Sequence, residues 1–104
     1  MRVLCEDNFH FALHDDEASG ALYLEAVCNQ SAAYFTVTCQ LLPVEAAHFG
    51  PPGARKVTAE GRALCGRLAD QAQWSPSKFA AARDEAWRAL GHARAPEVPS
   101  LSAR

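Results

Sequence analysis

The sequence has little that marks a secreted, membrane-spanning or metal-binding protein. No apolar run reaches the roughly 18–20 residues that a membrane span needs. The first residues lack the apolar stretch and cleavage site of a signal peptide, so a cytoplasmic protein is predicted. The four cysteines are then expected to be reduced, packed thiols: Cys5, Cys28, Cys39 and Cys65. Their spacings are too wide for a typical zinc site, and no metal or other cofactor is predicted.

Basic residues are nearly absent from the first half of the chain. Residues 1–50 hold one basic residue against seven acidic ones, a net charge of −6. Residues 51–104 hold nine basic against five acidic ones, a net charge of +4, and the whole chain carries −2. An acidic first half argues against nucleic acid as a partner, and bases spread along helices are typical of solvated faces.

The 104 residues contain no internal repeat and fit one domain. The composition changes only near the end, where Pro96 and Pro99 interrupt a stretch without apolar periodicity. We therefore expect a single α+β domain over residues 1–92 and a flexible C-terminal tail over residues 93–104.

Alternating apolar residues predict a three-stranded antiparallel meander in the first half. The alternation runs through residues 8–14, 21–28 and 32–42, with turns at 15–20 and 29–31. The residues expected to face the core are Phe9, Phe11, Leu13, Leu22, Leu24, Ala26, Cys28, Ala33, Phe35, Val37, Cys39 and Leu41. Pairing Leu13 with Leu22 and Cys28 with Ala33 matches every inward residue with an inward one, whereas a slip by one residue would break every match.

Helical signals fill the second half. Short helices are predicted over residues 43–49, 58–73 and 76–90, the last one beginning at Ser75-Pro76. Gly61 and Gly66 either weaken the middle helix or permit close packing on the sheet. Trp74 and Trp87 are expected in the core or at its edge. The predicted fold class is α+β, a three-stranded antiparallel meander followed by two or three helices packed on one sheet face.

The second face of the sheet is predicted to stay open. The expected register places His10 opposite Glu25 on this face, together with two tyrosines. The predicted partner surface joins the face to the acidic turn and consists of His10, Asp15, Asp16, Glu17, Tyr23, Glu25, Tyr34 and Thr36. Tyrosine buries a large ring with a polar tip, and acids favour a basic partner. The competing interpretation is an ordinary solvated sheet face.

No catalytic or phosphate-binding motif is present, and Cys28 and Cys39 are predicted to face away from His10. We therefore expect a small non-enzymatic protein-binding domain that contacts neither nucleic acid nor membrane. The sequence is also compatible with a homo-oligomer. One alternative is an immunity-type protein that neutralises a basic toxin. The chain resembles such small bacterial proteins in size, in the acidity of its first half and in its lack of motifs. The other alternative is a small enzyme using His10 and Glu25 as acid and base.

Overall fold

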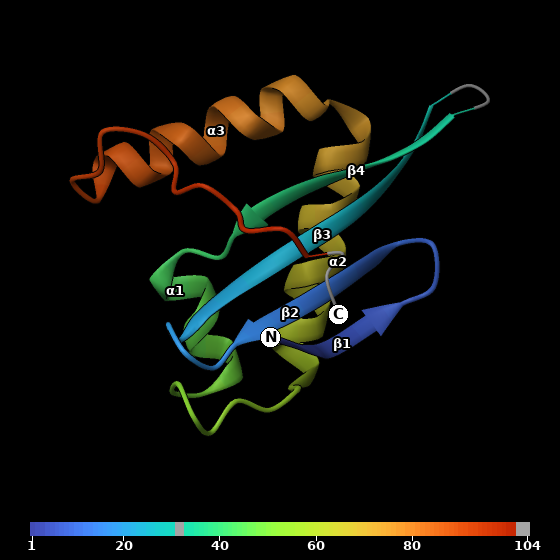
Figure 1. The fold of residues 1–104 in the computed structure, drawn as a ribbon. Helices are drawn as coiled ribbons and strands as arrows, with labels where there is room; N and C mark the ends of the chain where they lie inside the picture. The colour runs from blue at the N-terminus through green and yellow to red at the C-terminus, as the bar shows by residue number, and fades with distance from the viewer. Residues whose placement is uncertain (31–32, 102–104) are drawn as a thin grey trace.

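The sheet comes first in the chain and the helices follow it. A computed structural model describes residues 1–30 and 33–101 (Figure 1). The elements, in chain order, are β1 (Arg2–Asp7), β2 (Phe11–Asp16), β3 (Ala21–Gln30), β4 (Ala33–Gln40), α1 (Pro43–Ala46), the 3-10 turn η1 (Ala47–Phe49), α2 (Ala59–Trp74) and α3 (Pro76–Ala89). The sheet is an antiparallel meander in the order β1-β2-β3-β4. The α+β class is confirmed, with four strands instead of the three predicted.

The strand that the prediction missed is β1. Charged residues occupy three of its six positions, so its sequence shows no apolar alternation. Its pairing with β2 also shifts between Val3 and Cys5. A bulge of this kind changes which residues share a face, and a period of two is then not visible in the sequence. Cys5, which precedes the first strand predicted from the sequence, is a buried core residue of this strand.

Strand β2 begins later than predicted, because residues 8–10 belong to the turn that precedes it. The His10 amide donates to the Asp7 carbonyl at 3.0 Å. Phe9 has a φ of 57° and is 85% exposed. That left-handed backbone is typical of a tight turn and turns the ring away from the core. The expectation that Phe9 is a core residue is therefore wrong, and Phe11 is the first aromatic residue of the core.

The alternation of faces predicted for β2, β3 and β4 is correct, although Ala33 and Phe35 are exposed and lie outside the core, and both hairpin registers differ from the prediction by two residues. Leu13 pairs with Leu24 instead of Leu22, and Cys28 pairs with Phe35. A shift of two residues keeps every side chain on its face, because the side-chain period of a strand is two. The turn predicted at residues 29–31 is wrong at residues 29 and 30, which belong to β3, and residue 31 lies outside the described residues.

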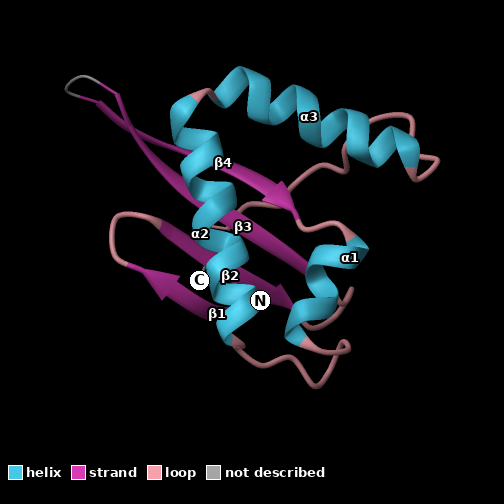
Figure 2. Cartoon of the chain, turned by 180° about the vertical axis from the view of Figure 1, so that it is seen from behind, coloured by secondary structure: helices cyan, strands magenta, loops and turns pink. Residues whose placement is uncertain are grey.

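Helix α2 lies across one face of the sheet (Figures 1 and 2). It begins at Thr58, whose Oγ1 accepts from the Gly61 amide at 3.0 Å. The apolar core between the layers consists of Cys5, Phe11, Leu13, Leu22, Leu24, Ala26, Cys28, Leu41, Phe49, Cys65, Leu68, Ala69, Ala72 and Phe79. The helices predicted in the second half are all present.

Gly61 allows α2 to approach η1 closely. A Cβ at this position would lie 2.6 Å from the Phe49 Cζ, and Phe49 is fully buried. Gly66 differs, because the nearest atom to a Cβ there is the His10 Cε1 at 3.7 Å, an ordinary contact. Close packing therefore explains Gly61 and does not explain Gly66.

A buried ion pair connects α3 to α1 and β4. Arg83 donates from Nη1 and Nη2 to the two carboxylate oxygens of Glu45, each at 2.7 Å. Its Nη2 also donates to the Gln40 carbonyl at 2.9 Å. Only 9% of the Arg83 side chain and 13% of the Glu45 side chain are exposed. Removing either residue would leave the other as an unpaired charge in a poorly solvated position. The ion pair as a whole therefore has to be kept for the fold to be stable.

The segment after α3 runs back over the sheet face that α2 does not cover, and Figure 1 shows it crossing in front of β3. The Ala95 amide donates to Asp84 Oδ1 at 2.7 Å, and Leu101 is 9% exposed. The described part of the predicted tail thus contacts the domain, although its flexibility stays a prediction. Residues 102–104 lie outside the described residues.

Phe11 and Phe9 give a matched pair for testing the start of β2. Replacing Phe11, which is 3% exposed, with Ala should lower the free energy of unfolding by about 3–5 kcal/mol, because the change leaves a cavity in the core. Phe9→Ala should change it by less than about 0.5 kcal/mol, since the ring lies in solvent. Urea denaturation measures both values. Equal losses for the two variants would show that the turn is placed incorrectly.

The two helix glycines should respond to alanine in opposite directions. Gly61→Ala is expected to destabilise the fold by about 1–3 kcal/mol, because the new methyl group collides with the Phe49 ring. Gly66→Ala is expected to stabilise it by up to about 1 kcal/mol through helix propensity. Thermal unfolding of both variants tests the packing, and a stabilised Gly61→Ala protein would refute it.

Candidate functional site

His10 lies on the helix side of the molecule and not on the opposite sheet face. Its Nε2 donates to Asp70 Oδ1 of α2 at 2.8 Å, and its Nδ1 is 3.5 Å from Asp7 Oδ2. The cross-strand partner of Glu25 is Ala12, so the predicted pairing of His10 with Glu25 is wrong. The acid–base pair that the small-enzyme alternative requires is therefore not assembled.

The histidine that contacts Glu25 is His14. A carboxylate only accepts, so His14 Nε2 donates to Glu25 Oε1, at 3.1 Å. His14 is 2% exposed, and its cross-strand partner Tyr23 is 7% exposed. Together with buried Ala12 they form a covered layer on the sheet face away from α2. The side-chain period of two places these residues on one face of the sheet. Which of them are neighbours depends on the β2–β3 register, and the predicted register was displaced by two residues.

The C-terminal segment lies over this layer. Figure 1 views the sheet with this segment in front and α2 behind, and Figure 2 shows the reverse order. Leu101 on the segment is buried, as are Tyr23 and His14 on the strands. This part of the sheet face is not an open surface, in contrast to the expectation from the sequence.

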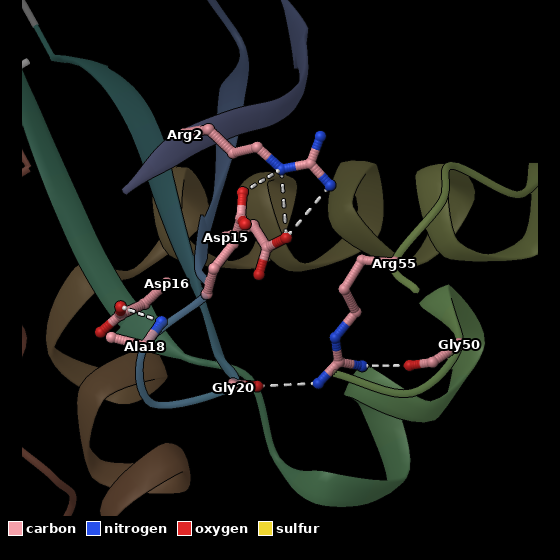
Figure 3. A network of polar contacts seen from close by, with 8 residues as sticks. Arg2, Asp15, Asp16, Ala18, Gly20, Gly50 and Arg55 are labelled. Carbon is pink, nitrogen blue, oxygen red and sulfur yellow. Dashed lines mark hydrogen bonds and ion pairs between the residues drawn. The ribbon is translucent and has the colours of Figure 1, made fainter. Parts of the chain in front are cut away.

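The acidic turn is largely paired within the molecule. Arg2 Nε donates to Glu17 Oε1 at 3.0 Å, and its Nη2 lies 3.3 Å from Oδ2 of Asp15 (Figure 3). Asp15 is 2% exposed. Asp16 accepts from Ser19 Oγ at 2.8 Å, and this bond is the main reason that the pKa of Asp16 is lowered. Arg2 therefore offsets part of the negative charge of the turn, whereas the bond from Ser19 favours the ionised form of Asp16.

Arg55 holds the same turn against the loop that follows η1 (Figure 3). Its Nη2 donates to the Gly20 carbonyl at 2.8 Å, and its Nη1 donates to the carbonyls of Ala46, at 2.9 Å, and Gly50. Gly20 and Gly50 have φ values of 78° and 85°, a conformation that favours glycine. These three hydrogen bonds give Arg55 a structural role, because they connect the turn before β3 to the loop after η1. The sequence analysis did not identify Arg55 as important.

The remaining residues of the predicted partner surface lie on β4. Tyr34 is 68% exposed and Thr36 is also exposed. Their partners on β3 are Val27 and Asn29, which lie beyond the last β2–β3 pair at Ala26, so both belong to the part of the β3–β4 hairpin that extends beyond β2 (Figure 1). Glu17 precedes the opposite end of β3. The eight predicted residues therefore do not form one continuous surface.

The cysteines carry free thiols and serve packing. Burial raises the pKa of Cys39 to about 11 and that of Cys65 to about 12. Burial also raises the pKa values of Cys5 and Cys28. A nucleophilic cysteine needs the opposite shift, because the thiolate is the reactive form. The surroundings of these thiols therefore oppose covalent catalysis.

A groove lies between α1, α2 and α3, on the helical side seen in Figure 2, and has a volume of about 690 Å³. Buried Leu68 and Phe79 contribute its apolar lining, and Asp70 and Lys78 lie among its polar lining residues. Trp74 also lines this groove and is 89% exposed. The expectation of a core position is confirmed for Trp87, which is 4% exposed, but is wrong for Trp74.

Within residues 1–30 and 33–101, no three His, Cys, Asp or Glu side chains are grouped so as to hold a metal ion. No helix in that part of the chain combines the length and the apolar character needed to cross a bilayer. No protein-family model, curated protein or solved structure matches the chain. The functional interpretation therefore rests on the geometry of these surfaces.

The raised pKa values of the buried thiols predict slow alkylation of the native protein. At about pH 8, iodoacetamide should label the folded chain slowly and all four thiols rapidly after denaturation. Labelling of the native protein should accelerate as the pH approaches the values of Cys39 and Cys65, because more thiolate then forms. Mass spectrometry counts the labels. A thiol that reacts rapidly in the native protein at about pH 8 would contradict this assignment.

Proposed function

We propose that this chain is a small non-enzymatic protein-binding domain and that the groove between α1, α2 and α3 receives an apolar segment of its partner. The observation that carries the proposal is the 89% exposure of Trp74 beside that groove. Tryptophan is on average a highly buried residue, and at interfaces it is enriched among the residues that dominate affinity.

The shape and chemistry of the groove favour an amphipathic helix as the bound segment. Leu68, Phe79 and Ala82 offer an apolar lining, and the volume of about 690 Å³ accommodates more than one apolar side chain. Asp70 and Lys78 give the polar lining charges of both signs, which suits a helix with apolar anchors and mixed charges. These charges do not favour a basic partner, which the immunity-type alternative requires.

The non-enzymatic part of the proposal is supported by the pairing of the polar groups. His10 and His14 each donate to a carboxylate, and His14 is buried. Burial holds the pKa values of Cys39 and Cys65 far above neutral. These groups are placed to stabilise the fold and are poorly placed to attack or protonate a substrate.

The groove is tested with amphipathic helical peptides selected from a displayed library against the whole chain. Trp74→Ala should weaken the selected peptides by at least about tenfold, equivalent to about 1.4 kcal/mol. The matched control is Leu90→Ala, which removes an apolar side chain that is 54% exposed and does not line the groove. This control should leave affinity unchanged, and both variants should keep the wild-type melting temperature.

Fluorescence gives an independent measure of the same binding event. Trp74 is exposed and Trp87 is 4% exposed, so burial of Trp74 by a peptide should shift its emission to shorter wavelength over a constant Trp87 contribution. Trp74→Phe should abolish the shift. Peptides that bind Trp74→Ala as tightly as wild type, or a library that yields no binder, would count against the groove.

A further inference from the structure

The two edges of the sheet differ in their protection against another strand. Strand β1 carries Arg2, Glu6 and Asp7, and its pairing with β2 is interrupted between Val3 and Cys5. Charges and bulges are the usual devices that prevent edge-to-edge pairing. Strand β4 has neither: it contains no charged residue, proline or glycine, and its eight residues pair with β3 without a shift in register.

The first half of β4 is accessible. In the described part of the chain β4 has no strand neighbour other than β3. Tyr34 is 68% exposed and Phe35 is 39% exposed. Figures 1 and 2 both show this end of the hairpin extending beyond the rest of the sheet and away from α3. The other end of β4 is partly covered, because Arg83 binds the Gln40 carbonyl, residues 37–40 are only partly exposed, and they line a small cavity together with residues of α3 and of the segment after it.

We propose that β4 pairs antiparallel with β4 of a second copy of this chain and forms a symmetric dimer with a continuous eight-stranded sheet. A free strand edge binds another strand through backbone hydrogen bonds. An uncharged run of aromatic and β-branched residues is the composition that pairs most readily, so an uncovered edge of this kind is an aggregation hazard. A second copy covers the edge in a closed, two-fold arrangement.

The side chains of β4 are self-complementary about a two-fold axis at Phe35. In that register Phe35 meets Phe35 of the second copy, and Tyr34 meets Thr36 of the second copy. No like charges oppose one another, in contrast to a β1–β1 pairing that would bring Glu6 and Asp7 together. Phe35 pairs with Cys28 and shares the core face, while Tyr34 and Thr36 lie on the other face, so both faces gain contacts.

The contact covers only a few residues of each chain, so we expect it to be weak. A stable interface buries more than about 1,000 Å², which pairing along half of one strand does not reach. The fraction of dimer should therefore rise with protein concentration. It does not involve the groove, and its failure would leave the proposed binding function untouched.

Sedimentation velocity over about 1 μM to 1 mM tests the dimer. The mass of the wild type should rise from 11.2 kDa toward twice that value with concentration. Thr36→Lys should raise the dissociation constant by at least about tenfold, because it places a charge from each copy in the paired edge. The matched control is Val44→Lys, at a position on α1 that is 72% exposed, and it should change nothing.

A second variant and a second readout locate the contact. Tyr34→Lys should weaken the dimer as Thr36→Lys does, while Trp74→Ala should leave it intact. Amide hydrogen exchange at residues 34–36 should slow with rising concentration in the wild type and not in the two lysine variants, whose melting temperatures stay unchanged. A wild type that is monomeric throughout the range would overturn the proposal, as would a dimer that persists in both lysine variants.

Discussion

Burial of one sheet face beneath α2 is the constraint on which the rest of the structure depends. The strands present Leu13, Leu24 and Cys28 to the helix, and each is fully buried. The residues on the helix side of this contact are small, and Cys65, Ala69 and Ala72 are also fully buried. Small side chains let the helix axis lie close to the sheet, and the absence of a side chain at Gly61 lets the start of the helix approach Phe49 of η1.

The sequence predicted which residues face the core better than it predicted their partners. Alternation assigns Leu13 and Leu24 to one face whatever the register, because a displacement of two residues conserves the pattern. The choice between registers depends on the turns that join the paired strands, which the alternation does not fix. The start of β2 was misplaced for a separate reason, because Phe9 in the preceding turn adopts a left-handed conformation that its residue type does not predict. Strand β1 escaped detection for a related reason, since its bulge removes the alternation.

The candidate surfaces were harder to predict because exposure depends on what packs above a residue. Tyr23 and Tyr34 share a face and a residue type, yet the segment that ends at Leu101 covers only the end of the sheet where Tyr23 lies. Trp74 is exposed because it is the last residue of α2, where the chain turns into α3. Neither the burial of Tyr23 nor the exposure of Trp74 can be predicted from the residues next to it in the sequence. The α+β class and the faces of β2, β3 and β4 could therefore be predicted from the sequence, whereas β1, both hairpin registers and the accessible surfaces could not.

The opposite charges of the two halves of the chain are used within the fold. Arg83 of the basic half binds Glu45 of the acidic half, and Asp70 of α2 accepts from His10 in the first turn of the sheet. Arg62 donates to the backbone carbonyl of Glu6 at 3.1 Å. The charge asymmetry, which suggested a basic partner, is offset within the fold by the buried ion pair between α3 and α1.

The cover over Tyr23 and His14 is contributed by residues that a ribosome adds after all four strands and all three helices. Synthesis proceeds at about 5–20 residues per second, while helix and hairpin formation take microseconds. The sheet and α2 can therefore assemble on the nascent chain while the second sheet face is still hydrated. Leu101 follows α3 by a dozen residues. A nascent chain paused before that segment emerges would present the Tyr23 face to chaperones.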